Sequence, residues 1–166
     1  MAKSSSNIKS VKPTSNSNYK QGYFNPKYPN KYKGSPPIIY RSGWELSFMN
    51  LLDTSPNIIE WTSEPVGIEY LNPLDNKVHT YYVDFYFKVK TENSMRSVLA
   101  EVKPKKQVEF PKQSNKKGKG LKSLANYKQA AETYIINQSK FGAASVWAAK
   151  NGMEFIVITE EFLYAK

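Results

Sequence analysis

The 166-residue chain contains no cysteine and a single histidine, His79. Without thiols it can form no disulfide, no thiolate metal site and no cysteine nucleophile, which suits a reducing compartment. A zinc site is nearly excluded, and a Ser-His-Asp triad would have to use His79, which stands in a strand-like run. No apolar run reaches the roughly 18 residues of a membrane helix, and no signal-peptide core is present. We therefore expect one soluble, intracellular domain.

Acidic residues are missing from two segments of the chain. The protein has 24 Lys and Arg against 14 Asp and Glu, a net charge of +10. Residues 1–33 hold seven Lys and no acid, and residues 103–122 hold eight Lys and one acid. The remainder is mildly acidic, so the basic charge is segmental. This pattern favours a polyanionic partner.

Residues 1–37 consist mainly of Ser, Asn, Lys, Pro and Tyr, with almost no aliphatic side chains. Such a segment buries too little apolar surface to offset the entropy of ordering. We expect a flexible basic arm over residues 1–37, followed by the ordered domain over residues 38–166. Residues 23–33 interleave tyrosine with lysine, a composition that can stack on bases and neutralise phosphates. The alternative is a solubilising tail, or one whose tyrosines pack on the domain.

Local patterns predict an α/β domain. Ser42 and Glu45 have the spacing of a capping box, which marks a helix start. The segregated strands and the final helix-to-strand return favour a mixed β-sheet flanked by helices, in the order α-β-β-β-β-α-α-β. The expected elements are a helix over residues 43–53, short strands over 57–64 and 66–71, a turn over 73–76, a strand over 78–90 with its hairpin partner over 97–104, a lysine-rich loop over 105–120, two helices or one bent helix over 121–151 ending at Gly152, and a buried strand over 154–159.

Two acids fall inside the most apolar hairpin. Asp84 and Glu101 each stand between two apolar residues. If the turn is centred between residues 92 and 93, the register places Asp84 opposite Glu101. Directly opposed residues have Cβ atoms about 4.5 to 5.5 Å apart, where two like charges destabilise each other unless a positive charge lies between them. A divalent cation would supply that charge, and the two-residue period puts Lys103 on the same face as Glu101.

This set of side chains suits metal-dependent phosphodiester cleavage. Carboxylate oxygens suit Mg²⁺, with Mn²⁺ as a substitute, because hard cations prefer oxygen ligands. We therefore assign Asp84 and Glu101 to the metal, and Lys103 to the attacking water and the phosphate. The alternative is that Glu101 and Lys103 form an ordinary surface pair and Asp84 caps a solvent-facing position.

The order of elements, with an acid on the first helix and then Asp and Glu-x-Lys on a hairpin, resembles the PD-(D/E)XK nuclease core, the restriction-endonuclease-like fold. Collinear blocks also resemble the head completion nucleases of large contractile-tailed phages, and the same layout is similar to the endonuclease subunit of some bacterial transposases. These blocks are residues 28–34, 39–45, 81–86, 101–107 and 155–161.

The resemblance implies a metal-dependent DNA endonuclease, with exonuclease activity as a further option, that trims packaged DNA so that filled heads accept tails. Its partners would be double-stranded DNA and the phage portal or neck proteins. Its location would be the host cytoplasm during assembly, or the virion. By position the family's acids fall on Glu45, Asp84 and Glu101, all metal ligands, and its lysine on Lys103. One departure is Val83, where the family usually has proline.

Several alternatives stay open. Glu45 could serve only the capping box, and the protein could be a transposase-type endonuclease, a junction resolvase, or a non-catalytic DNA-binding connector protein. Candidate DNA contacts, each with a solvated surface as its alternative, are Arg41, Lys105, Lys106, Gln107, Lys116, Lys117, Lys119, Lys122 and Lys128.

Overall fold

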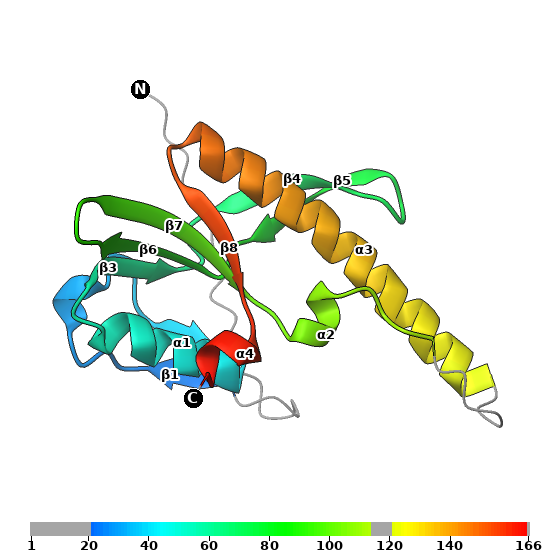
Figure 1. Cartoon of the computed structure of the whole chain (residues 1–166), viewed down its shortest axis with the longest axis horizontal. Coiled ribbons are helices and arrows are strands. Elements are labelled where there is room, and N and C mark those ends of the chain that lie inside the picture. Colours follow the sequence, from blue (N-terminus) through cyan, green and yellow to red (C-terminus); the bar gives the residue numbers. More distant parts are fainter. Residues whose placement is uncertain (1–20, 114–120, 166) are drawn as a thin grey trace.

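The computed structural model of the protein describes residues 21–113 and 121–165 (Figure 1). In chain order its elements are β1 (Gly22–Phe24), the 3-10 helix η1 (Pro29–Lys31), β2 (Ile38–Tyr40), α1 (Gly43–Thr54), β3 (Ile58–Ser63), β4 (Gly67–Asn72), β5 (Lys77–Tyr82), β6 (Phe85–Lys90), β7 (Met95–Val102), α2 (Lys105–Val108), α3 (Leu121–Lys150), β8 (Glu154–Ile158) and α4 (Glu160–Leu163).

A four-stranded mixed sheet in the order β3-β6-β7-β8 forms the centre of the fold. Strand β6 is antiparallel to both β3 and β7, whereas β8 is parallel to β7. A parallel neighbour needs a long crossover connection, and α3 lies in this one. The mixed sheet with flanking helices confirms the predicted restriction-endonuclease-like core.

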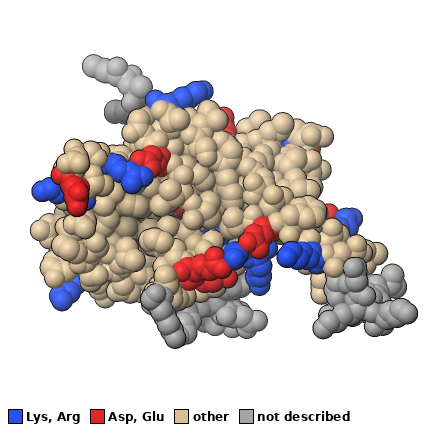
Figure 2. Space-filling view, viewed as in Figure 1, with Lys and Arg blue, Asp and Glu red and all other residues tan. Residues whose placement is uncertain are grey.

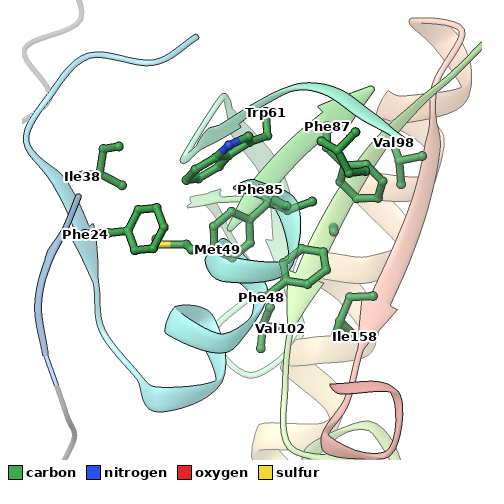
Figure 3. Packing of buried hydrophobic residues seen from close by; sticks show 13 residues of the cluster. Phe24, Ile38, Phe48, Met49, Trp61, Phe85, Phe87, Val98, Val102 and Ile158 are labelled. Atoms are coloured by element: carbon green, nitrogen blue, oxygen red, sulfur yellow. The ribbon is translucent and has the colours of Figure 1, made fainter. Parts of the chain in front are cut away.

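Both faces of the sheet are covered. Because successive strand residues point to opposite faces, β7 directs Val98 toward α1 and Leu99 toward α3. On the α1 side, the Phe48 ring lies 5.3 Å from the Phe85 ring, within a fully apolar cluster (Figure 3). On the α3 side the fully buried Ala144 lets the helix approach closely. The sheet therefore lies between α1 and α3.

The predicted strand over residues 78–90 is wrong as a single strand. Strand β5 pairs with β4 in a separate two-stranded sheet, the chain bends at residues 83 and 84, and β6 then joins the central sheet. Because of this bend, Val83 packs in the cluster under α3, whereas Phe85 packs in the cluster under α1. The predicted turn over residues 73–76 is confirmed, and it joins β4 to β5.

The C-terminal half has one long helix. Residues 121–150 form the continuous helix α3, and Gly152 follows in a left-handed conformation with φ of 67°, as predicted for the stop. The short helix α2 lies within the predicted loop over residues 105–120. Among the helices of residues 21–113 and 121–165, none combines the length and the apolar character needed to cross a membrane.

The segment over residues 21–37 is ordered, so the prediction of a flexible arm is wrong for it. Strand β1 pairs with β2, and Phe24 and Tyr32 place their ring centroids 5.7 and 4.8 Å from that of the buried Trp61. Aromatic rings supply the buried surface that the missing aliphatic residues do not. Residues 1–20 lie outside the described part of the chain.

A buried carboxylate fixes the same segment to α1. Asp53 Oδ2 accepts the backbone N–H of Lys27 at 2.7 Å, and Oδ1 accepts that of Tyr28 at 3.2 Å. The Lys31 ammonium donates to the Asp53 carbonyl at 3.0 Å. Because Asp53 is 1% exposed, these bonds are shielded from water.

We predict that Asp53→Ala lowers the free energy of unfolding by about 1 to 3 kcal/mol, because it removes the buried acceptor of two backbone donors. Urea denaturation measures the difference. Glu92→Ala, in the exposed β6–β7 turn, is the control and should change stability by less than about 0.5 kcal/mol. An unchanged midpoint for Asp53→Ala would mean that the segment is held by its rings alone.

Candidate active site

The predicted register of the β6–β7 hairpin is confirmed. Phe85 pairs with Ala100, so the next position along places Asp84 beside Glu101. Each carboxylate accepts a backbone N–H from the opposite strand: that of Val102 donates to Asp84 Oδ2 at 2.8 Å, and that of Asp84 donates to Glu101 Oε2 at 3.3 Å. These reciprocal bonds fix both acids where the hairpin leaves the sheet.

Lys103 completes the predicted Glu-x-Lys arrangement. Its Nζ lies 2.7 Å from Glu101 Oε1, and only 24% of its side chain is exposed. Its backbone N–H donates to the Ile158 carbonyl at 2.9 Å, so β8 positions the lysine. The alternative of an ordinary surface pair does not fit, because Glu101 is 3% exposed.

The electrostatics of this group indicate a shortage of positive charge. Burial, with the Glu101 charge beside it, raises the pKa of Asp84 to about 7. Burial alone would lower the pKa of Lys103, but Asp84 and Glu101 together raise it above its usual value. Lys103 is therefore a cation at neutral pH. Its single positive charge acts on two carboxylates, those of Asp84 and Glu101.

Glu45 lies at the margin of this group and forms half of the predicted capping box, because its carboxylate accepts the backbone N–H of Arg41 and not that of Ser42. Its N–H donates to Ser42 Oγ at 3.1 Å, and its Oε1 accepts the Ser42 hydroxyl at 3.0 Å. Its Oε2 accepts the backbone N–H of Arg41 at 2.8 Å. Burial and the neighbouring Asp84 charge raise the pKa of Glu45. Both carboxylate oxygens are thus used by the start of α1.

The predicted metal site with three carboxylates is not formed within the described residues. No group of three or more His, Cys, Asp or Glu side chains there is placed to hold one ion. Asp84 and Glu101 still fit a hard divalent cation, because Mg²⁺ often takes only one or two carboxylates and completes its shell with water and substrate phosphate. Oδ1 of Asp84 has no hydrogen-bond partner in the described chain, which leaves it available to a cation.

A cleft of about 560 Å³ opens beside this group. It brings together predicted residues that are more than 60 positions apart in the sequence. The amide nitrogen of the buried Asn137 donates to the Gln107 carbonyl at 3.2 Å and so fixes α2 at one wall. The predicted residues that line the cleft are Arg41, Glu45, Lys103, Lys106 and Gln107.

A protein-family model, described as the N-terminal part of TnsA-like endonucleases, matches residues 55–160, which include Asp84, Glu101 and Lys103. The chain belongs to the TnsA-like endonuclease family. It is also 35% identical, over 147 residues, to the head completion nuclease of Enterobacteria phage T4. That match covers 87% of this chain and 93% of the relative.

In this TnsA-like endonuclease, two of the predicted DNA contacts are held in ion pairs. Arg41 Nη1 lies 2.7 Å from Glu64 Oε1, and Lys105 Nζ lies 2.5 Å from Glu161 Oε1. Figure 2 shows acidic and basic side chains alternating along the edge of the molecule near α4 and α2. DNA phosphates would therefore have to exchange with these acids.

Glu64 is a residue near the site that the sequence did not indicate. Its φ of 48° is a left-handed conformation, which is unfavourable for a residue with a side chain. The pair with Arg41 and the bond from its N–H to the Asp84 carbonyl, 2.9 Å long, hold it there. The strained turn thereby fixes the backbone of Asp84.

Among the described residues, the predicted contacts Lys122 and Lys128 do not line the cleft. Lys122 and Lys128 are exposed on the first turns of α3, which extend beyond the sheet (Figure 1), and Lys128 lies 3.8 Å from Glu132. Lys116, Lys117 and Lys119 lie outside the described residues.

We predict that the metal-free protein loses stability as pH rises through the pKa of Asp84, because ionisation then sets two adjacent carboxylates against each other. Asp84→Asn cannot ionise, so in EDTA at pH 8 it should unfold with a free energy about 1 to 3 kcal/mol above that of the unsubstituted protein. The gain should shrink as pH falls toward 4, where the wild-type carboxyl is protonated in both states.

Urea denaturation at pH 5 and pH 8 measures this difference. Asp75→Asn, in the exposed β4–β5 turn, is the control and should bring no gain at pH 8. If Asp84→Asn raises the free energy of unfolding by the same amount at both pH values, the gain does not come from the ionisation of Asp84.

Proposed function

We propose that this protein is a Mg²⁺-dependent DNA endonuclease acting in phage head completion. The observation that carries the proposal is the group formed by Asp84, Glu101 and Lys103 at the end of a hairpin, in a member of an endonuclease family. Lys103 forms an ion pair with Glu101 and also interacts with the Asp84 charge. The head completion nuclease of phage T4, similar to this chain over most of its length, supports the biological setting. The substrate is double-stranded DNA.

Each residue then has a role in the chemistry. Bound by Asp84 and Glu101, a divalent ion would offset the charge of the phosphate and acidify a water molecule. Because neighbouring acids keep Lys103 protonated, it acts as a donor toward the phosphate and the developing charge, and not as a general base. Glu45 is a positioning residue: it fixes the start of α1 at the wall of the cleft and adds negative charge near Lys103.

The proposed partners follow from the same setting. Trimming of packaged DNA would bring the protein to the portal or neck proteins, in the host cytoplasm or on the virion. A second candidate is a transposase-type endonuclease, which the matching family model favours. Cleavage only of specific transposon ends would support the second candidate, whereas cleavage of linear duplexes irrespective of end sequence would support the first.

We predict that Asp84→Ala and Glu101→Ala abolish Mg²⁺-dependent cleavage and leave DNA binding largely intact, because both acids serve the metal. Lys103→Ala should lower kcat by about a hundredfold or more. The assay compares linear and circular duplexes with and without Mg²⁺, using Asp75→Ala as a control that should cleave normally. Full activity of either carboxylate variant would refute the site assignment.

The four lysines of residues 1–20 generate a separate prediction. Deleting residues 1–20 should weaken DNA binding and reduce the dependence of log affinity on log salt, since each lost phosphate contact lowers that slope by about 0.9. Titrations at several salt concentrations measure the slope. An unchanged slope would assign these lysines to something other than DNA.

A further inference from the structure

Lys140, near the middle of α3, is a basic residue that the proposed mechanism does not use. Its ammonium nitrogen lies 5.5 Å from the centre of the Tyr70 ring and 5.6 Å from that of the Tyr81 ring. The two rings meet edge to face at 5.9 Å, on the paired strands β4 and β5. The hairpin and the helix thus hold the lysine in one place.

The same ammonium group lies within electrostatic reach of the catalytic residues. Lys140 interacts with the charges of Lys103, Glu101 and Asp84, although those residues are about 40 or more positions away in the sequence. Burial, and then the positive charge of Lys103, lower the pKa of Lys140. A second cation is therefore brought to the carboxylate pair from a different element of the fold.

Lys140 lies within reach of the Glu101 and Asp84 charges but forms no ion pair with them. Within residues 21–113 and 121–165 no carboxylate lies in ion-pair range of its nitrogen. A methionine could cover the two tyrosine rings with the same stem and no charge to desolvate. Packing of the stem alone therefore does not explain why a charged lysine, and not a methionine, occupies this partly buried position near Lys103.

The hydroxyl of Tyr81 is a second unsatisfied donor in this corner. It is buried and has no hydrogen-bond partner within the described chain. Burial, with the charges of Glu101 and Asp84, raises the pKa of this tyrosine, so the hydroxyl keeps its proton. A phosphate oxygen of bound DNA would accept a hydrogen bond from such a donor.

We propose that Lys140 binds a phosphate group of the DNA strand at the active site, as a second phosphate-binding lysine beside Lys103. The inference rests on the proposed nuclease function. Lys140 is not among the residues that line the cleft between α1 and α2. The DNA-binding surface then continues from that cleft across Asp84 and Glu101 to α3.

The experiment compares Lys140→Met, Lys140→Arg and Lys150→Met in the full-length protein. Lys150→Met is the matched control, because it removes an exposed lysine from the same helix about 15 Å away. Affinity for a short duplex is measured in EDTA at several salt concentrations, and kcat and KM are measured with Mg²⁺. Thermal unfolding checks that each variant is folded.

Lys140→Met should weaken duplex binding in EDTA by about five- to tenfold and reduce the salt slope by about 0.9, as expected for one lost phosphate contact. It should also raise KM. Lys140→Arg should stay within about threefold of the unsubstituted protein because it keeps the charge. Lys150→Met should behave as wild type.

Unchanged binding and salt slope in Lys140→Met would overturn the inference. So would equal losses in Lys140→Arg and Lys140→Met, because the stem and not the charge would then matter. An inactive unsubstituted protein would instead contradict the proposed function, and the binding measurement in EDTA would still decide whether Lys140 contacts phosphate.

Discussion

The register between β6 and β7 is the constraint on which the site depends. Side chains alternate between the faces of a strand, so a slip of one residue would send Glu101 into the apolar cluster under α1 and separate it from Asp84. The bonds from backbone N–H groups to the Asp84 and Glu101 carboxylates hold this register at the point where the sheet ends. Two acids that repel each other are thereby kept adjacent by the stability of the surrounding sheet.

The helices on the two faces give the site its walls. Helix α1 begins at the capping box of Ser42 and carries Glu45 to the edge of the cleft, and α3 carries Lys140 to the other side of the carboxylates. Because α1 contacts the sheet through the buried Phe48 and α3 approaches it at the buried Ala144, each helix lies at its own fixed distance from the sheet. The positions of the charged groups in the candidate site are thus set by the apolar packing of the two helices.

Local patterns in the sequence predict which two acids are paired in the site, but not the contacts that surround them. The two-residue period and the position of one turn predicted the pairing of Asp84 with Glu101, because a hairpin is a local structure. The strained turn at Glu64 and the approach of Lys140 depend on contacts between distant elements, which no spacing reveals. The order of residues 21–37 was missed for a similar reason, since Phe24 and Tyr32 are buried by Trp61, far along the chain.

The pairing of β1 with β2 has a consequence for the lysines that precede it. Gly22 lies opposite Tyr40, one residue before Arg41 in the wall of the cleft, so the chain enters the fold beside the active site. Twenty residues span at most about 70 Å, which limits how far residues 1–20 can reach from that point. If the lysines of residues 1–20 hold DNA, as proposed, that DNA meets the carboxylates within one molecule, at an effective concentration that depends on the number of intervening residues and not on the amount of DNA in solution.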